Sequence, residues 1–120
     1  MLSNFEGFTL VSERGSCKPK QDQYFSNCHS RNVESHNDCA ATCTILDSLI
    51  AFNYAISKQR CKLIMTSNPE NGCPNSSTWE MVFGNTENLF AKKVDDLKAF
   101  EKADYVCYAK IYVIYLCIMG

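Results

Sequence analysis

Eight cysteines in a chain of 120 residues constrain this protein more than any other feature of its sequence. A domain of this size has a modest hydrophobic core, and small domains rich in cysteine are typically held together by disulfides in an oxidising compartment. We therefore expect a disulfide framework and an extracellular or secreted protein. The alternative is a cytosolic protein that keeps its cysteines reduced.

Composition narrows the class of protein further. Hydrophobic residues make up 46% of the chain and charged residues 21%, as in globular proteins. The net charge of −1 argues against a protein that binds nucleic acid. The longest apolar stretch, 111–119, is about half the ~20 residues that a membrane helix needs, so we expect no membrane insertion by this chain.

The first residues lack the basic end and the apolar run of a signal peptide. Because this conflicts with secretion, we expect the chain to be part of a longer secreted or membrane-anchored precursor. Within the chain we expect a single domain at 1–112, followed by an apolar tail or strand extension at 113–120.

Hydrophobic periodicity predicts an α+β fold, in which helices pack on an antiparallel sheet. The first 34 residues are expected to be rich in loops with short strands, and Gly15 and Pro19 fall in segments that predict breaks. The expected elements are a first strand at Phe8 and Leu10, a helix of about three turns from Ser35, a hairpin of strands 49–56 and 61–65, a strand at 79–83, a helix at 86–103 and a strand at 105–116.

Different sequence features predict the two helices. Ser35 and Asp38 resemble a capping box, with Asp in place of the usual Glu or Gln. Cys39 and Cys43 follow four residues apart, so they share one helix face. The second helix, 86–103, is amphipathic, with charged residues opposite an apolar stripe. This stripe consists of Leu89, Phe90, Val94, Leu97 and Phe100.

Three segments together have a specific spacing, and they are Cys39-Ala-Ala-Thr-Cys43, Ala51-Phe52-Asn53-Tyr54 and Cys61-Lys62-Leu63. This arrangement resembles the PAN or apple domains, most strongly over 35–65. The resemblance implies an antiparallel sheet with a disulfide-stapled helix, and a non-catalytic extracellular module that binds proteins or carbohydrates. It also implies that Cys39 pairs with Cys61, and that Cys17 pairs with Cys107 to tie the two ends of the domain together.

The sequence departs from the family pattern before the aromatic strand. Family members often carry a cysteine there as the partner of the second helix cysteine, but 47–50 contains none. Cys43 must therefore pair with Cys28 or Cys73, and we favour Cys73 because its loop follows the strand nearest the helix. Cys28 and Cys117 then pair or stay free, and the sequence does not decide between these outcomes. The second helix is also longer than the family pattern implies.

Zinc binding by a small intracellular protein is the alternative from a different functional class. The possible ligands are His36, Cys39 and Cys43 on one helical stripe, with Cys28 or His29 as the fourth. Structural zinc sites usually contain a second pair of closely spaced ligands, which is missing here, so we expect neither a metal nor another cofactor. We expect no enzyme either, because a nucleophilic cysteine is usually a single one and no catalytic motif is present.

Lys58, Arg60 and Lys62 alternate around the expected hairpin turn, which places their side chains on one face if strand geometry persists. This cluster is the expected ligand-binding site, for an acidic extracellular protein or an anionic glycan. Asn75 begins the sequon Asn75-Ser76-Ser77 in a loop rich in turn formers, and is the expected glycosylation site of a secreted protein.

The C-terminal segment, 111–120, is apolar at both alternating sets of positions. A strand of this kind is normally buried on both faces. The second helix could cover it, a second chain could bind to it in self-association, or the natural protein could continue past Gly120.

Overall fold

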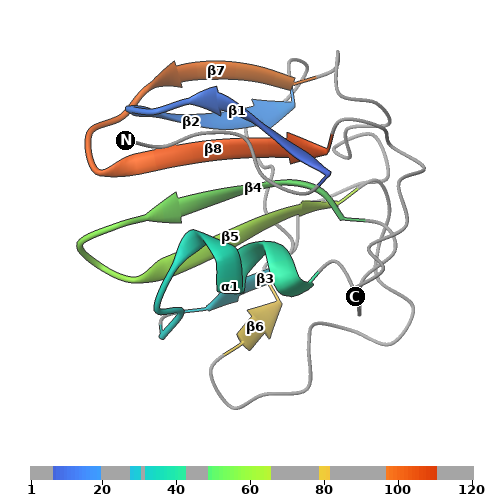
Figure 1. The fold of residues 1–120 in the computed structure, drawn as a ribbon, viewed down its shortest axis with the longest axis vertical. Coiled ribbons are helices and arrows are strands. Elements are labelled where there is room, and N and C mark those ends of the chain that lie inside the picture. Colours follow the sequence, from blue (N-terminus) through green and yellow to red (C-terminus); the bar gives the residue numbers. More distant parts are fainter. Residues whose placement is uncertain are drawn as a thin grey trace.

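The computed structural model describes residues 7–19, 28–30, 32–42, 49–65, 79–81 and 97–110. Most of these residues lie in strands, which one short helix accompanies (Figure 1). The strands are β1 (Phe8–Ser12), β2 (Gly15–Pro19), β3 (Cys28–Ser30), β4 (Leu49–Ala55), β5 (Arg60–Met65), β6 (Trp79–Met81), β7 (Leu97–Glu101) and β8 (Tyr105–Lys110). The helix is α1 (His36–Ala41).

Six strands form one antiparallel sheet in the order β1-β8-β4-β5-β3-β6. The hairpin β4–β5 and the strand β8, which the sequence predicted, lie at its centre (Figure 1). Every residue of β4 and β8 is buried, because both faces of the sheet are covered. On one face the sheet packs against α1, and on the other it packs against the two-stranded antiparallel sheet β2–β7.

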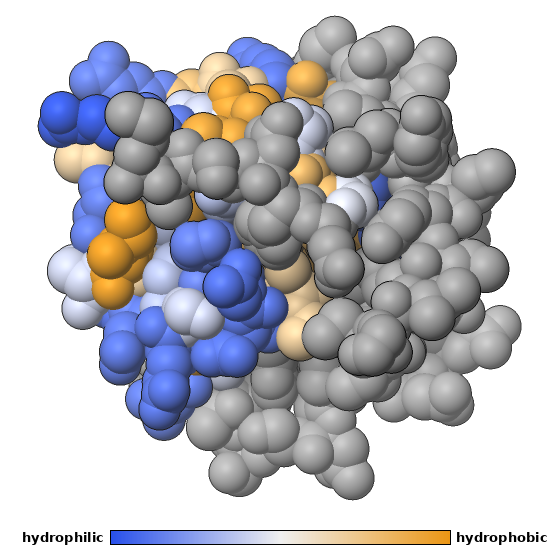
Figure 2. All heavy atoms as spheres, viewed as in Figure 1, coloured by the Kyte–Doolittle hydropathy of each residue, from blue (hydrophilic) through white to orange (hydrophobic). Residues whose placement is uncertain are grey.

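Aromatic rings form the core beneath α1. The ring of Phe52 packs edge-on against Phe8, with centroids 5.4 Å apart, and stacks on Tyr108 at 5.5 Å. His36, the first residue of α1, stacks on Tyr108 at 5.2 Å. Each such pair adds about 0.5–1.5 kcal/mol beyond the area it buries, so the stack ties α1 to three strands. The outer side of α1 is hydrophilic (Figure 2).

The opposite face of the sheet carries small side chains where β2 packs on it. Ala51 and Ala109 are fully buried there in a cluster with Cys17 and Cys107. The side chain of Asn53 accepts a hydrogen bond from the Cys17 N–H at 2.7 Å and donates one to the Cys17 carbonyl at 2.9 Å. The amide of Asn53 therefore satisfies both backbone groups of a buried residue, as a neighbouring strand would.

α1 begins where the sequence predicted and ends earlier. The hydroxyl of Ser35 accepts a hydrogen bond from the Asp38 N–H at 3.2 Å and donates one to the Asp38 carboxylate at 3.3 Å. The helix ends after six residues, where the Thr42 hydroxyl donates to the carbonyl of Cys39 at 2.8 Å. The rest of the expected three turns, 43–48, lies outside the described residues.

The helix expected at 86–103 is wrong at its C-terminal end. Leu97–Glu101 forms β7, which pairs antiparallel with β2. The spacing of Leu97 and Phe100 fits one face of a helix, but it does not reveal that a distant strand offers backbone hydrogen bonds to the same residues. The beginning of the expected helix, 86–96, lies outside the described residues.

Gly15, which the sequence marked as a break, is a point of close approach inside β2. A Cβ atom at this position would lie 2.4 Å from the Ser12 hydroxyl oxygen and 2.7 Å from the Phe100 carbonyl oxygen. Real Cβ atoms do not come so close, so any larger residue would push β2 away from β7. The glycine therefore permits the strand pairing instead of ending it.

The strands expected at 79–83 and 105–116 are present as β6 and β8 where the structure describes them. The expected domain limits, 1–112 and 113–120, depend on segments that lie outside the described residues. Within the described part of the chain, no helix has the length and apolar character required to cross a membrane.

Candidate functional site

Two disulfides join distant parts of the fold. Cys17 is bonded to Cys107, and Cys39 is bonded to Cys61, with Cα–Cα distances of 5.9 and 5.8 Å. These are the two pairs that the family resemblance implied. All four cysteines are fully buried, and the bridges close sequence separations of 90 and 22 residues. The disulfides fit an extracellular or otherwise oxidising environment.

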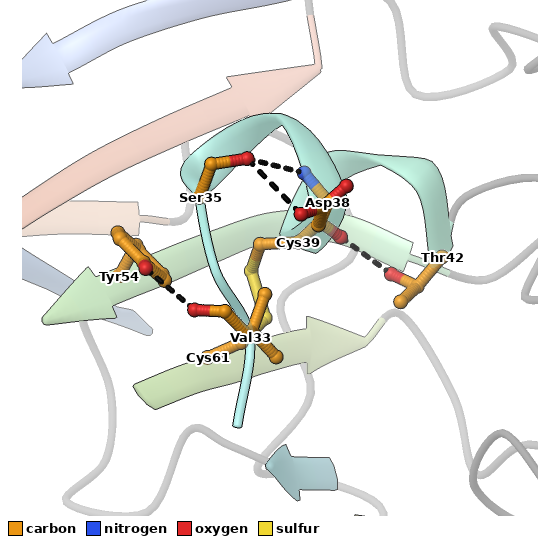
Figure 3. The surroundings of a disulfide bond; sticks show 7 residues. All are labelled: Val33, Ser35, Asp38, Cys39, Thr42, Tyr54 and Cys61. Atoms are coloured by element: carbon orange, nitrogen blue, oxygen red, sulfur yellow. Dashed lines mark hydrogen bonds between the residues drawn. A yellow bond between two sulfur atoms is a disulfide. The ribbon is translucent and has the colours of Figure 1, made fainter. Parts of the chain in front are cut away.

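The Cys39–Cys61 bridge attaches α1 to β5 (Figure 3). Beside it, the hydroxyl of Tyr54 donates a hydrogen bond to the carbonyl of Val33, which holds the segment before α1 against β4. Burial and the neighbouring acidic side chains raise the pKa of Tyr54, which keeps the phenol protonated as this hydrogen bond requires. This face of α1 is therefore occupied by the core and is not available to a partner.

The proposed zinc ligands have other roles where the structure describes them. Cys39 and Cys28 are both disulfide-bonded, the latter to a partner outside the described residues. His36 stacks on Tyr108, and burial lowers the pKa of its imidazole. Among the described residues, no group of three or more His, Cys, Asp or Glu side chains is arranged to hold a metal ion.

The other predicted cysteine and glycosylation positions are not described by the structure. Cys43, Cys73 and Cys117 lie outside the described residues, and so does Asn75. The pairing of Cys43 with Cys73 and the glycosylation of Asn75 therefore stay predictions.

The two turns at one end of the sheet are hydrogen-bonded to each other. They connect β4 to β5 and β7 to β8, and both lie on the left in Figure 1. The Asp104 carboxylate accepts hydrogen bonds from the Ser57 N–H at 2.9 Å and from the Ser57 hydroxyl at 2.7 Å. The Asp104 carbonyl accepts a third, from the Ile56 N–H at 2.9 Å. These contacts fix the relative position of the two turns.

Backbone conformation and charge are both unusual at Asp104. Its φ is 74°, in the left-handed region that few residues other than glycine adopt, although Asp tolerates it better than most. The two hydrogen bonds from Ser57 lower the pKa of the Asp104 carboxyl, and the charge of Lys58 lowers it further. The carboxylate is thus ionised and bonded to Ser57 at neutral pH.

The predicted ligand-binding residues lie at this end of the sheet. Lys58 is exposed in the β4–β5 turn, whereas Arg60 and Lys62 are partly exposed at alternate positions of β5. The Lys62 ammonium lies 5.2 Å from the centre of the Tyr105 ring. A fourth cation, Lys102 in the β7–β8 turn, lies 4.4 Å from the centre of the same ring. We call Lys58, Arg60, Lys62 and Lys102 the basic surface.

Within the described part of the chain, no close ion pair joins a carboxylate to the four side chains of the basic surface. The Asp104 carboxylate accepts its hydrogen bonds from Ser57, but its charge still attracts Lys58 and partly offsets the positive charge there. Sequence reasoning missed Lys102 because this residue fell within the helix expected at 86–103. The local signal was a lysine two residues before the turn-forming Asp104.

The arrangement can attract and hold an anion, since several cations gather at a rigid and partly exposed surface. Comparison with known proteins gives no further guidance on the ligand. No family model, no curated protein and no solved structure matches the chain. The basic surface and the two buried disulfides are therefore the features of the described residues that bear on the function.

Proposed function

We propose that this protein is a non-catalytic extracellular binding module of the PAN or apple type, which recognises an anionic partner through the basic surface. The partner is an acidic extracellular protein or an anionic glycan. The observation that carries the proposal is the gathering of four cationic side chains, from two hydrogen-bonded turns and one strand, with the Asp104 carboxylate as the one negative charge seen to act on them among the described residues.

The disulfides support the assignment to this type of module. Cys39–Cys61 attaches the helix to the hairpin, and Cys17–Cys107 joins segments near the two ends of the chain, as the family resemblance implies. An antiparallel sheet with a disulfide-linked helix packed on it also agrees with the expected architecture, although the end of the second expected helix is the strand β7. A fold held by two buried covalent bonds keeps its surface turns in place, and such turns are a usual location of binding residues.

The same bonds argue against a catalytic thiol. All five described cysteines are disulfide-bonded, so none of them offers a thiolate to a substrate or to zinc. A thiol count under denaturing conditions separates the binding module from the reduced zinc protein. We expect close to zero free thiols, whereas a count close to eight, one for every cysteine, would favour the zinc protein.

The binding site is tested with the parent protein and the triple variant Lys58→Ala/Arg60→Ala/Lys62→Ala. Both are applied to a glycan array and to a panel of immobilised extracellular matrix proteins. We expect the parent to bind an anionic member of these sets, and its binding to weaken as salt rises, because exposed charges are screened within about 8 Å at physiological ionic strength.

The triple variant should remain folded, since Lys58 is exposed, Arg60 and Lys62 are partly exposed, and changes at the surface usually cost less than about 0.5 kcal/mol each. It should lose most of the binding of the parent. If the folded variant binds as tightly as the parent in low and high salt, the basic surface is not the binding site.

A further inference from the structure

We propose that Lys62 and Lys102, both positioned by the ring of Tyr105, form the central contact of this site, and that its ligand is a linear sulfated glycan. This inference rests on the proposed function and makes it more specific. It adds two residues to the site that the sequence pattern did not include, and it selects one class of partner.

Tyr105 fixes the positions of both lysines. Its side chain is only 4% exposed and lies in β8 opposite Ala55 of β4, whose small side chain leaves room for the ring. The ammonium groups of Lys62 and Lys102 lie 5.2 and 4.4 Å from the ring centre, within the distance at which a cation is attracted to an aromatic face. Two flexible side chains are thus held in place before a ligand arrives.

Bringing two cations to one ring leaves a charge that an anion can neutralise. From the two ring distances, the ammonium groups are at most about 10 Å apart, which is close to the screening length at physiological ionic strength. The two like charges therefore repel each other. An anionic group between them is attracted by both, and lysine suits a compact anion such as a sulfate group because its ammonium acts as a point charge with three donors.

The basic residues come from one strand and from separate turns instead of surrounding one point. Arg60 and Lys62 come from β5, and Lys102 comes from the β7–β8 turn. The backbone N–H of Lys102 donates a hydrogen bond to the backbone carbonyl of Arg14 at 3.0 Å, so the β1–β2 turn with the exposed Arg14 lies beside the β7–β8 turn. Separate cations on several elements match a linear chain with repeated anionic groups better than a single small anion.

The surroundings of Tyr105 favour a glycan over a protein partner. The centre of a protein interface usually contains accessible aromatic or apolar side chains, whereas the Tyr105 ring is almost inaccessible. Among the described residues, the large hydrophobic side chains that are exposed are Val11 and Ile56. Ile56 is 51% exposed beside Ser57, so a protein partner would be expected to use it. Ile56 therefore distinguishes the two partners in an experiment.

The test measures binding of the full chain to a sulfated glycosaminoglycan oligosaccharide and to its desulfated counterpart. Polyglutamate and vesicles of phosphatidylserine and phosphatidylcholine serve as the protein-like and membrane-like probes. The variants are Lys102→Ala and its matched control Lys98→Ala, which removes the same charge at an exposed position of β7. Ile56→Ser is the third variant, and melting curves establish that each variant is folded.

We expect Lys102→Ala to bind the sulfated oligosaccharide about tenfold more weakly, because one charged contact is lost. The affinity of this variant should also depend less steeply on salt concentration, by roughly one released counterion, because it neutralises one anionic group fewer on the linear polyanion. Lys98→Ala and Ile56→Ser should bind within about twofold of the parent, because neither residue belongs to the basic surface. If Lys102→Ala does not fold, Lys62→Gln replaces it with the same expected loss.

Three results would overturn the inference. Equal weakening by Lys98→Ala and Lys102→Ala would show a general charge effect without a defined site. Equal binding of the desulfated oligosaccharide, or of the vesicles, would exclude sulfate recognition. Binding to polyglutamate or to an acidic protein that is lost both in Ile56→Ser and in the triple variant would exclude the glycan. The proposed function would then stand. If the parent binds no anionic probe at all, both proposals fail.

Discussion

The Asp104 carboxylate binds the backbone N–H and the hydroxyl of Ser57, a residue 47 positions earlier in the chain. Ser57 lies in the β4–β5 turn and Asp104 in the β7–β8 turn, so this contact joins the two turns. Neither of the two disulfides between described residues connects these turns. The contact also keeps the Asp104 carboxylate ionised beside Lys58, so a negative charge is fixed at the edge of the basic surface. One pair of residues therefore affects both the rigidity of the candidate site and its charge.

We expect the Ser57–Asp104 contact to stabilise the protein in a pH-dependent way. The hydrogen bonds lower the pKa of Asp104 in the folded protein below the ordinary value of 3.8. The contribution is therefore fully present above about pH 4 and is lost as the pH falls through the lower pKa of the folded state. Ser57→Ala removes one of the two bonds, so its melting temperature should be below that of the parent at neutral pH.

Melting curves of the parent and Ser57→Ala at about pH 7 and about pH 2 test this expectation. The difference between the two proteins should shrink at the lower pH, because protonation of Asp104 weakens its hydrogen bonds to Ser57. A difference of the same size at both pH values would mean that the hydroxyl of Ser57 acts independently of the charge on Asp104.

The two described disulfides should differ in how much they stabilise the fold. In the chain-entropy model, Cys39–Cys61 contributes roughly 3 kcal/mol and Cys17–Cys107 contributes nearly 5 kcal/mol, because the second closes a much longer loop. Urea unfolding of the variants Cys39→Ala/Cys61→Ala and Cys17→Ala/Cys107→Ala measures the two costs. A larger loss from removing the shorter loop would mean that local strain or packing outweighs loop entropy here.

Local features of the fold could be predicted from the sequence. Ser35 and Asp38 mark the start of a helix because their side chains satisfy free N–H groups within the same turn. The polar turn 57–60 separates two strands that pair directly with each other. In both cases the interacting residues are close in the sequence, so a short window contains all the information.

The pairing of β2 with β7 could not be predicted in this way. Its partners are about 80 residues apart, and neither segment shows strand periodicity by itself. Because 86–103 was expected to be a helix, the contact between Lys102 and the Tyr105 ring could not be predicted either. The basic surface was found in part, since Arg60 and Lys62 alternate along one strand, but its fourth cation depends on tertiary structure.

His36 should make stability fall in mildly acidic solution. Burial lowers the pKa of its imidazole below the ordinary value of 6.5, so the unfolded chain binds a proton first as the pH falls. His36 therefore does not lower the free energy of unfolding above about pH 6.5, but it lowers this free energy increasingly as the pH falls below that value. His36→Phe keeps a ring to stack on Tyr108 but cannot titrate, so its unfolding free energy should change less than that of the parent between about pH 7 and about pH 5. Identical pH profiles would exclude this role of His36.

Two polar side chains are buried where β2 packs on the large sheet, namely Asn53 of β4 and Ser16 of β2. Asn53 bonds both backbone groups of Cys17, so Asn53→Ala leaves a buried N–H and a buried carbonyl without their partner. Each such loss costs about 1–3 kcal/mol, and we expect a total decrease in unfolding free energy of roughly 2–4 kcal/mol. The cavity left by the amide adds to this decrease in unfolding free energy.

Ser16 is the matched control because it is as buried as Asn53 and lies next to Cys17, whereas its hydroxyl has no hydrogen-bond partner in the described structure. Ser16→Ala removes a polar atom that gains nothing from burial, so this variant should equal the parent within about 0.5 kcal/mol or be more stable. Urea unfolding of both variants provides the comparison. If Ser16→Ala is as damaging as Asn53→Ala, then tight packing around β2, and not the two hydrogen bonds of Asn53, holds this strand against the sheet.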